Sequence, residues 1–124
     1  MIPTAEVAAF LRRLSTDAAE SFAETFLVGD KFGARTISRD QFLQALPGRA
    51  AMFTRAGIGS PELADTTVTN LDDHYLLART QWIAPRETGE PVQLASSYLL
   101  HYDGSALRVV AYLNHRGPSD VDDA

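Results

Sequence analysis

The sequence contains no cysteine. This absence excludes a disulfide framework, a thiolate nucleophile and cysteine metal ligands, and it fits a protein of the reducing cytosol. Long apolar runs are also missing, and the N-terminus lacks a basic segment followed by an apolar core. The sequence therefore predicts neither a signal peptide nor a membrane span, and we expect a cytoplasmic protein.

Basic residues are few and are scattered along the chain. The net charge is −5, and Lys31 is the one lysine beside the arginines. Because no basic stripe forms, nucleic acid is a poor partner on electrostatic grounds. The three histidines are too far apart in the sequence to predict a metal site. We predict no cofactor, and a chain of 124 residues is long enough for one domain with its own core.

The strongest local signal is a β-hairpin near the C-terminus. Residues 92–102 and 107–115 are rich in β-branched, aromatic and aliphatic side chains, and the turn Asp103-Gly104-Ser105 separates them. An Asp-Gly pair between two such runs favours a tight turn. Neither run alternates cleanly between apolar and polar residues, so we expect both faces of this hairpin to be covered.

The N-terminal half is expected to be mainly helical. Residues 4–27 carry apolar side chains at helical spacing, and Ser15-Thr16-Asp17 divides them, which leaves open one long helix or two short ones. Residues 28–37 contain turn-forming glycines and predict a loop with at most a short strand. Ser38 and Gln41 have the spacing of a capping box, so a helix begins there, and Pro47 should kink or interrupt it.

Strand-forming residues dominate from Leu63 onward. The segments 63–69 and 75–83 precede the hairpin, and the polar loop 85–91 leads into it. Helices followed by consecutive antiparallel strands predict an α+β fold in which N-terminal helices pack on a curved, mainly antiparallel sheet. We expect a single domain over residues 1–116 and a disordered acidic tail over 117–124.

Three stretches resemble the nuclear transport factor 2-like fold, which includes the SnoaL-like polyketide cyclases, ketosteroid isomerases and scytalone dehydratase. They are the segments 38–43 (SRDQFL), 78–83 (ARTQWI) and 107–115 (LRVVAYLNH), and the resemblance extends over residues 4–116. It implies a cone-shaped pocket for a small hydrophobic ligand and a homodimer formed through the outer sheet face. The motifs indicate the fold and not an activity, because members of this family share an architecture but differ in their chemistry.

The catalytic residues of this family do not transfer to the chain. Ketosteroid isomerases use a tyrosine from the first helix and acids on the sheet. Here the first helical block contains Phe10, Phe22 and Phe26 and no tyrosine, and the strands between Tyr75 and His115 carry no acid outside their turns and loop. We therefore assign no catalytic residue from the resemblance.

Strand alternation and residue chemistry give a set of candidate pocket residues. They are Asp30, Thr80, Trp82, Ser97, Tyr112 and Asn114. Thr80 and Trp82 share one face of their strand. In the closing strand, either Tyr112 and Asn114 or Leu113 and His115 face the cone, and we favour the first pair. The alternative that Trp82 and Tyr112 are ordinary core residues without a role in ligand binding stays open.

Two functions fit this pattern. The first is a binding protein that holds a small, mostly apolar molecule without transforming it. The second is a lyase, isomerase or cyclase that uses general acid-base catalysis, with Asp30 as base and Tyr112 or His115 polarising a carbonyl compound. A purely structural domain would be favoured if aromatic side chains filled the cone.

Overall fold

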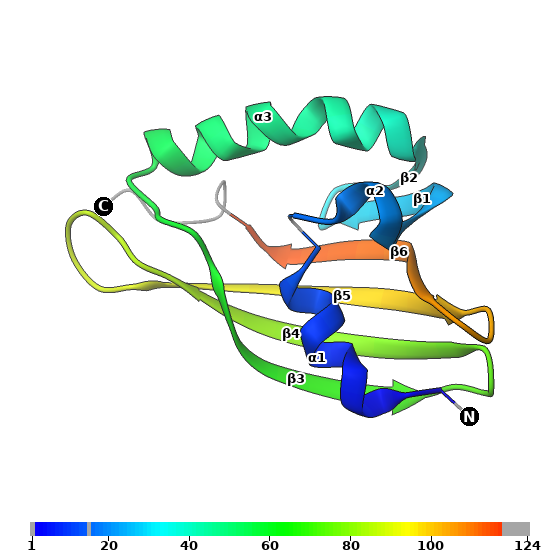
Figure 1. Cartoon of the computed structure of the whole chain (residues 1–124). Coiled ribbons are helices and arrows are strands. Elements are labelled where there is room, and N and C mark those ends of the chain that lie inside the picture. The colour runs from blue at the N-terminus through cyan, green and yellow to red at the C-terminus, as the bar shows by residue number, and fades with distance from the viewer. Residues whose placement is uncertain (1, 15, 118–124) are drawn as a thin grey trace.

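The computed structural model of the chain describes residues 2–14 and 16–117. It contains the short helices α1 (Val7–Arg12) and α2 (Ala18–Ser21) and the long helix α3 (Arg39–Arg55). A 3-10 turn, η1 (Thr4–Glu6), precedes α1. Figure 1 shows α1 lying across the strands and α3 running along the top of the sheet.

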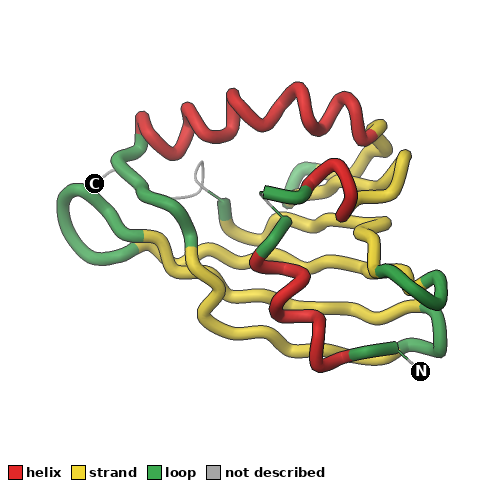
Figure 2. The backbone as a smooth tube through the Cα atoms, in the orientation of Figure 1, coloured by secondary structure: helices red, strands yellow, loops and turns green. Residues whose placement is uncertain are grey.

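The helices pack against one six-stranded sheet. Its strands are β1 (Phe22–Asp30), β2 (Gly33–Ser38), β3 (Glu62–Asn70), β4 (Tyr75–Ala84), β5 (Val92–Tyr102) and β6 (Leu107–Arg116). The order across the sheet is β2-β1-β6-β5-β4-β3. Neighbours are antiparallel except β1 and β6, which are parallel. Figure 2 shows the helices together on one side of the strands, and the predicted α+β class is confirmed.

The predicted N-terminal helical block is too long. The chain does divide into two short helices around residue 15, but the helical part ends at Ser21 and strand β1 begins at Phe22. The error has a geometric cause. Phe22 and Phe26 are four residues apart, and this spacing places two side chains on the same face of a helix and also on the same face of a strand. Both phenylalanines are buried on the inner face of the sheet.

The prediction of a loop with at most a short strand at residues 28–37 is also wrong. It forms most of an antiparallel hairpin in which Val28 pairs with Arg35 and Asp30 pairs with Gly33. Gly33 at the turn has a φ of 143°, a conformation that favours glycine. Strand β2 lies at the edge of the sheet, where its backbone pairing with β1 compensates for a weak apolar pattern.

Helix α3 starts as predicted but continues further without a break. Ser38 accepts a hydrogen bond from the Gln41 backbone N–H at 3.1 Å, and the Gln41 side chain accepts one from the Ser38 N–H at 2.9 Å. This reciprocal capping box fixes the start of the helix. The expected interruption at Pro47 does not occur, because α3 runs through it to Arg55.

The C-terminal hairpin is confirmed. Asp103 accepts hydrogen bonds from the backbone N–H groups of Ser105 and Ala106 at 2.9 and 2.8 Å. These bonds and an ion pair with Arg108 hold the pKa of Asp103 well below its ordinary value. Gly104 supplies the positive φ of 102° that the turn requires.

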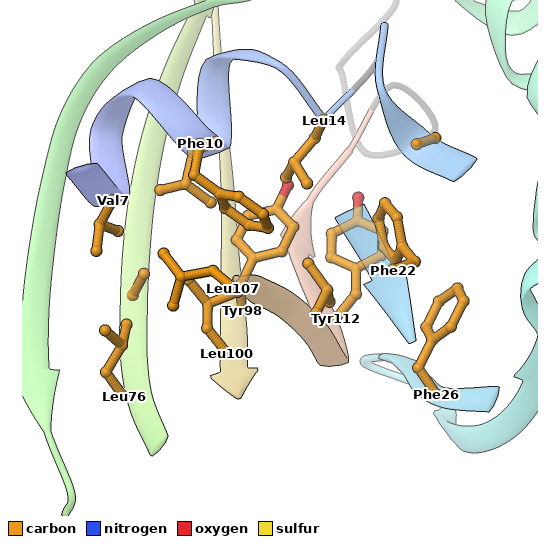
Figure 3. Packing of buried hydrophobic residues seen from close by; sticks show 14 of the residues in the cluster. Val7, Phe10, Leu14, Phe22, Phe26, Leu76, Tyr98, Leu100, Leu107 and Tyr112 are labelled. Atoms are coloured by element: carbon orange, nitrogen blue, oxygen red, sulfur yellow. The ribbon is translucent and has the colours of Figure 1, made fainter. Parts of the chain in front are cut away.

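The main core lies between α1, α2 and the inner face of the sheet. Leu11 on α1 packs with Leu76, Leu100 and Val109 from β4, β5 and β6, and each of these side chains is almost completely buried. Figure 3 shows this cluster with Tyr98 and Tyr112 beside it. A smaller cluster under the C-terminal end of α3 contains Ile58, Ala84, Val92 and Leu94.

A bulge in β6 changes which residues face the helices. The pairing moves from Leu100 with Val109 to Leu99 with Ala111, so Val110 is the extra residue. As a result Leu107 and Val109 are buried inside together with Tyr112. Strict alternation therefore fails across Val110, and Tyr112 and Asn114 face inward beyond it.

In the part of the chain that the structure describes, no helix combines the length and the apolar character needed to cross a membrane. The predicted acidic tail begins at Gly117, and residues 118–124 lie outside the described residues.

Candidate ligand pocket

A pocket of about 200 Å³ separates α3 from the inner face of the sheet. Its walls are largely apolar: Leu11 from α1, Leu46 and Phe53 from α3, Trp82 from β4 and Leu94 from β5 all line it. No residue of α3 is fully buried, although this helix carries an apolar face. The pocket contributes to this, because Leu46, Arg49 and Phe53 of α3 line it and remain partly exposed.

Helix α3 brings the charged side chain of Arg49 to the pocket. Arg49 donates a hydrogen bond of 2.8 Å from Nη2 to the hydroxyl of Tyr112. Its guanidinium carbon lies 5.5 Å from the centre of the Tyr112 ring and 5.9 Å from that of Phe53, within the range of cation–π attraction. Three contacts thus hold one long side chain in a defined position.

Arg49 is charged despite its surroundings. Burial opposes the charged form, but the phenols of Tyr112 and Tyr98 outweigh this effect and hold the pKa of Arg49 above its ordinary value. Tyr98 stacks on Tyr112 with ring centres 5.1 Å apart, and burial raises the pKa of Tyr98 so that it stays a neutral phenol.

On the sheet side of the pocket, hydrogen bonds to neighbouring strand residues orient Trp82. The indole Nε1–H donates to Thr80 Oγ1 at 2.7 Å and also approaches Ser96 Oγ at 3.2 Å. Thr80 in turn donates to the carbonyl of Ser96 at 2.9 Å. Since the indole N–H is already used, Trp82 offers the pocket an apolar surface and no free donor.

The structure brings together four of the six residues predicted for the pocket. Trp82, Tyr112 and Asn114 line it, and Thr80 lies directly beneath Trp82 as its hydrogen-bond partner. Their common location follows from the register, in which Thr80 is opposite Ser96 and Ser96 is opposite Asn114.

Asp30 and Ser97 lie elsewhere, which corrects their assignment to the pocket. Asp30 is exposed at the end of β1, where its carboxylate accepts the backbone N–H of Phe32 at 2.9 Å. Ser97 faces the outer side of the sheet, and its hydroxyl lies 2.7 Å from Nε2 of His115. The run Ala95-Ser96-Ser97 has no apolar alternation, so sequence alone could not decide which serine faces inward.

Sequence reasoning overlooked Arg49 and Ser96. A signal for Arg49 was present, because Phe42, Leu46, Arg49 and Phe53 follow one another at the four, three and four residue spacing of a single helical face. A charged residue inside an apolar stripe indicates a polar group directed at the interior. Among the described residues, no group of His, Asp and Glu side chains could hold a metal ion.

Comparison with solved structures defines the fold class. The chain is similar to a nuclear transport factor 2-like protein of unknown function from Shewanella oneidensis, with a TM-score of 0.70, 10% identity, and 92% of this chain and 99% of that chain covered. It is also similar to a nuclear transport factor 2-like protein with a cystatin-like fold from Novosphingobium aromaticivorans. There the TM-score is 0.67, the identity is 16%, and 98% of this chain and 83% of that chain are covered.

A third similar structure is a nuclear transport factor 2-like protein of unknown function from Prochlorococcus, with a TM-score of 0.64, 11% identity and 94% of each chain covered. No protein-family model and no curated protein matches this sequence. The chain therefore has the nuclear transport factor 2-like fold, as its sequence predicted, and at these identities the likeness extends to the fold alone.

Proposed function

We propose that the chain binds a small, mostly apolar molecule in the pocket between α3 and the sheet. The observation that supports this most is the hollow of about 200 Å³ beneath an apolar helix face. Well-packed proteins leave few voids larger than a water molecule. A ligand that fills the space would bury the exposed parts of Leu46, Phe53 and Trp82, and burial of apolar surface stabilises the complex.

The alternative of general acid-base catalysis loses its base and one of its two polarising groups, and Tyr112 alone remains in the pocket. Asp30 is exposed at a hairpin turn, and His115 lies on the outer face beside Ser97. The described lining of the pocket contains no His, Asp or Glu. An acid-base pair requires titratable groups within hydrogen-bond reach of the substrate, so binding without transformation is the better supported function.

A thermal-shift screen against small hydrophobic acids, ketones and alcohols tests this proposal. A ligand at a hundredfold excess over its Kd stabilises the folded state by about 2.7 kcal/mol, which raises the Tm of a domain of this size by roughly 10 °C. Leu46→Phe adds volume inside the pocket and should abolish the shift. Gln44→Phe places the same aromatic ring on the exposed side of α3 and should preserve the shift in Tm. An unchanged Tm across the whole panel would contradict the proposal.

We also propose that two copies of the chain associate through the outer sheet face. Paired residues share a face, and one row of them crosses four strands: Leu27 of β1, Ala111 of β6, Leu99 of β5 and Leu77 of β4. All four are half-buried. A continuous apolar row on a face without covering helices is suited to contact with a second copy.

Light scattering at micromolar concentration tests this association. The wild type should have the mass of a dimer. Leu99→Arg places a charge in the middle of the apolar row and should give a monomer, whereas Gln44→Arg adds the same charge on the exposed side of α3 and should remain dimeric. A monomeric wild type would refute the proposed contact.

A further inference from the structure

Arg49 has no negatively charged partner in the described part of the chain. Neither the ion pair of Arg13 with Asp17 nor that of Arg108 with Asp103 involves Arg49. Among the described residues, the hydrogen bond of Arg49 goes to the neutral phenol of Tyr112. A partly buried charge is costly unless an opposite charge or several hydrogen bonds compensate for it. The described surroundings of Arg49 thus offer its charge a phenol and two aromatic rings, and no anion.

Most of the hydrogen-bonding capacity of Arg49 is unused. A guanidinium carries five N–H donors in a planar fork, and one bond to Tyr112 uses one of them. Among the described residues, Thr66 Oγ1 is the one fully buried side-chain polar atom without a hydrogen-bond partner. The nitrogens of Arg49 that make no hydrogen bond are therefore not fully buried, and the residue that carries them lines the pocket.

The charge distribution of the pocket differs from that of the protein as a whole. Arg12 and Arg116 line it together with Arg49, and its described lining contains no Asp or Glu. The complete chain nevertheless has a net charge of −5. A site whose charged side chains are all positive, in an acidic protein, selects for anions and against cations.

The walls restrict what else the anion can carry. Apart from its arginines the pocket is lined mainly by aliphatic and aromatic side chains. Its volume of about 200 Å³ somewhat exceeds the roughly 150 Å³ of an apolar cavity known to accept benzene. The occupant is therefore about the size of one six-membered ring with a short substituent.

We propose that the ligand of this pocket is a small organic acid, with its carboxylate on Arg49 and its apolar body between Phe53 and Trp82. The planar fork of arginine matches the two oxygens of a carboxylate, and the Tyr112 hydroxyl, fixed by Arg49, lies beside the same position. This inference rests on the proposed binding function and specifies the class of ligand.

Fluorescence of Trp82 can test the inference directly. It is the single tryptophan of the chain and it lines the pocket, so selective excitation of tryptophan reports on occupancy. Suitable probes are cyclohexanecarboxylate, the neutral cyclohexanecarboxamide and the cation cyclohexylamine, because they have similar shapes and do not absorb with the indole. We expect the carboxylate to bind at least about tenfold more tightly than the amide, and the amine more weakly than either.

Two arginine substitutions that each remove one positive charge test whether the preference for the carboxylate comes from Arg49. Arg49→Met should reduce the affinity for the carboxylate to that for the amide, whereas Arg35→Met, on the exposed edge strand β2, should leave it unchanged. The comparison of probes on the wild type does not depend on whether the Arg49 variant folds. Equal affinities for carboxylate and amide on the wild type would overturn the inference and leave the proposed function intact. Absence of any response to all three probes would overturn both.

Discussion

Thr66 and Thr80 are directly paired on strands β3 and β4, yet their hydroxyl groups have opposite surroundings. Thr80 Oγ1 donates to the Ser96 carbonyl at 2.9 Å, lies 2.7 Å from Ser96 Oγ and accepts the Trp82 indole N–H at 2.7 Å. Thr66 Oγ1 is buried without any hydrogen-bond partner among the described residues. Replacement of either threonine by valine removes the hydroxyl and keeps the shape, so the two substitutions should change stability in opposite directions.

The magnitude follows from the number of groups left unpaired. Thr80→Val removes the hydrogen bonds of a residue that is 2% exposed, including the one from its hydroxyl to the Ser96 carbonyl. The Trp82 indole N–H keeps a weaker contact with Ser96 Oγ at 3.2 Å. With about 1 kcal/mol for a lost hydrogen bond and about 1–3 kcal/mol for a buried group left unsatisfied, Thr80→Val should lower the free energy of unfolding by about 2–3 kcal/mol.

Thr66→Val should instead raise the free energy of unfolding by up to about 1 kcal/mol, because it removes a desolvated hydroxyl that has no partner. Urea denaturation followed by circular dichroism measures both changes, and the slope of the transition should match that of the wild type. If both substitutions destabilise the protein equally, the hydroxyl of Thr66 has a partner and the reasoning is refuted.

Two further predictions concern the core and the hairpin turn. Leu100→Ala should lower the free energy of unfolding by about 2–5 kcal/mol, because Leu100 is fully buried. The same substitution at Leu71, which is 57% exposed, should have little effect in the same urea titration. Because hydrogen bonds in the turn hold the pKa of folded Asp103 below its ordinary value, its ionised form stabilises the fold above the unfolded pKa of about 4, and this stabilisation is lost as the pH falls toward the folded pKa. The advantage of the wild type over Asp103→Asn should therefore be constant above about pH 5 and shrink below about pH 4, and an advantage independent of pH would contradict this.

The sequence predicted the fold class because its strongest signals are local. The Asp103-Gly104 turn and the capping box at Ser38 specify backbone conformations through groups that are neighbours in the sequence. Two of the three segments that resemble the nuclear transport factor 2-like fold, 38–43 and 107–115, lie at these signals.

The errors occurred where local patterns have two solutions. Phe22 and Phe26 are equally compatible with a helix and with a strand, and the parallel pairing of β1 with β6 decides in favour of the strand. The bulge at Val110 depends on pairing with neighbouring strands, so a strict alternation could not anticipate the inward positions of both Val109 and Tyr112.

The candidate site was predictable only in part, for a related reason. Trp82 and Tyr112 could be placed by residue type and strand alternation. The choice of Ser96 over Ser97 depends on the register between β4 and β5. Arg49 acquires its role only when α3 lies over the closing strand and its guanidinium meets the Tyr112 hydroxyl, which is a contact between residues distant in the sequence.

The central claim is that a small molecule binds between α3 and the inner face of the sheet, and intermolecular nuclear Overhauser effects test it most directly. With cyclohexanecarboxylate as the probe, we predict contacts from its ring protons to the side chains of Trp82 and Phe53, which line the pocket. Contacts confined to Leu99 on the outer sheet face, or no contacts at saturating probe, would contradict the claim.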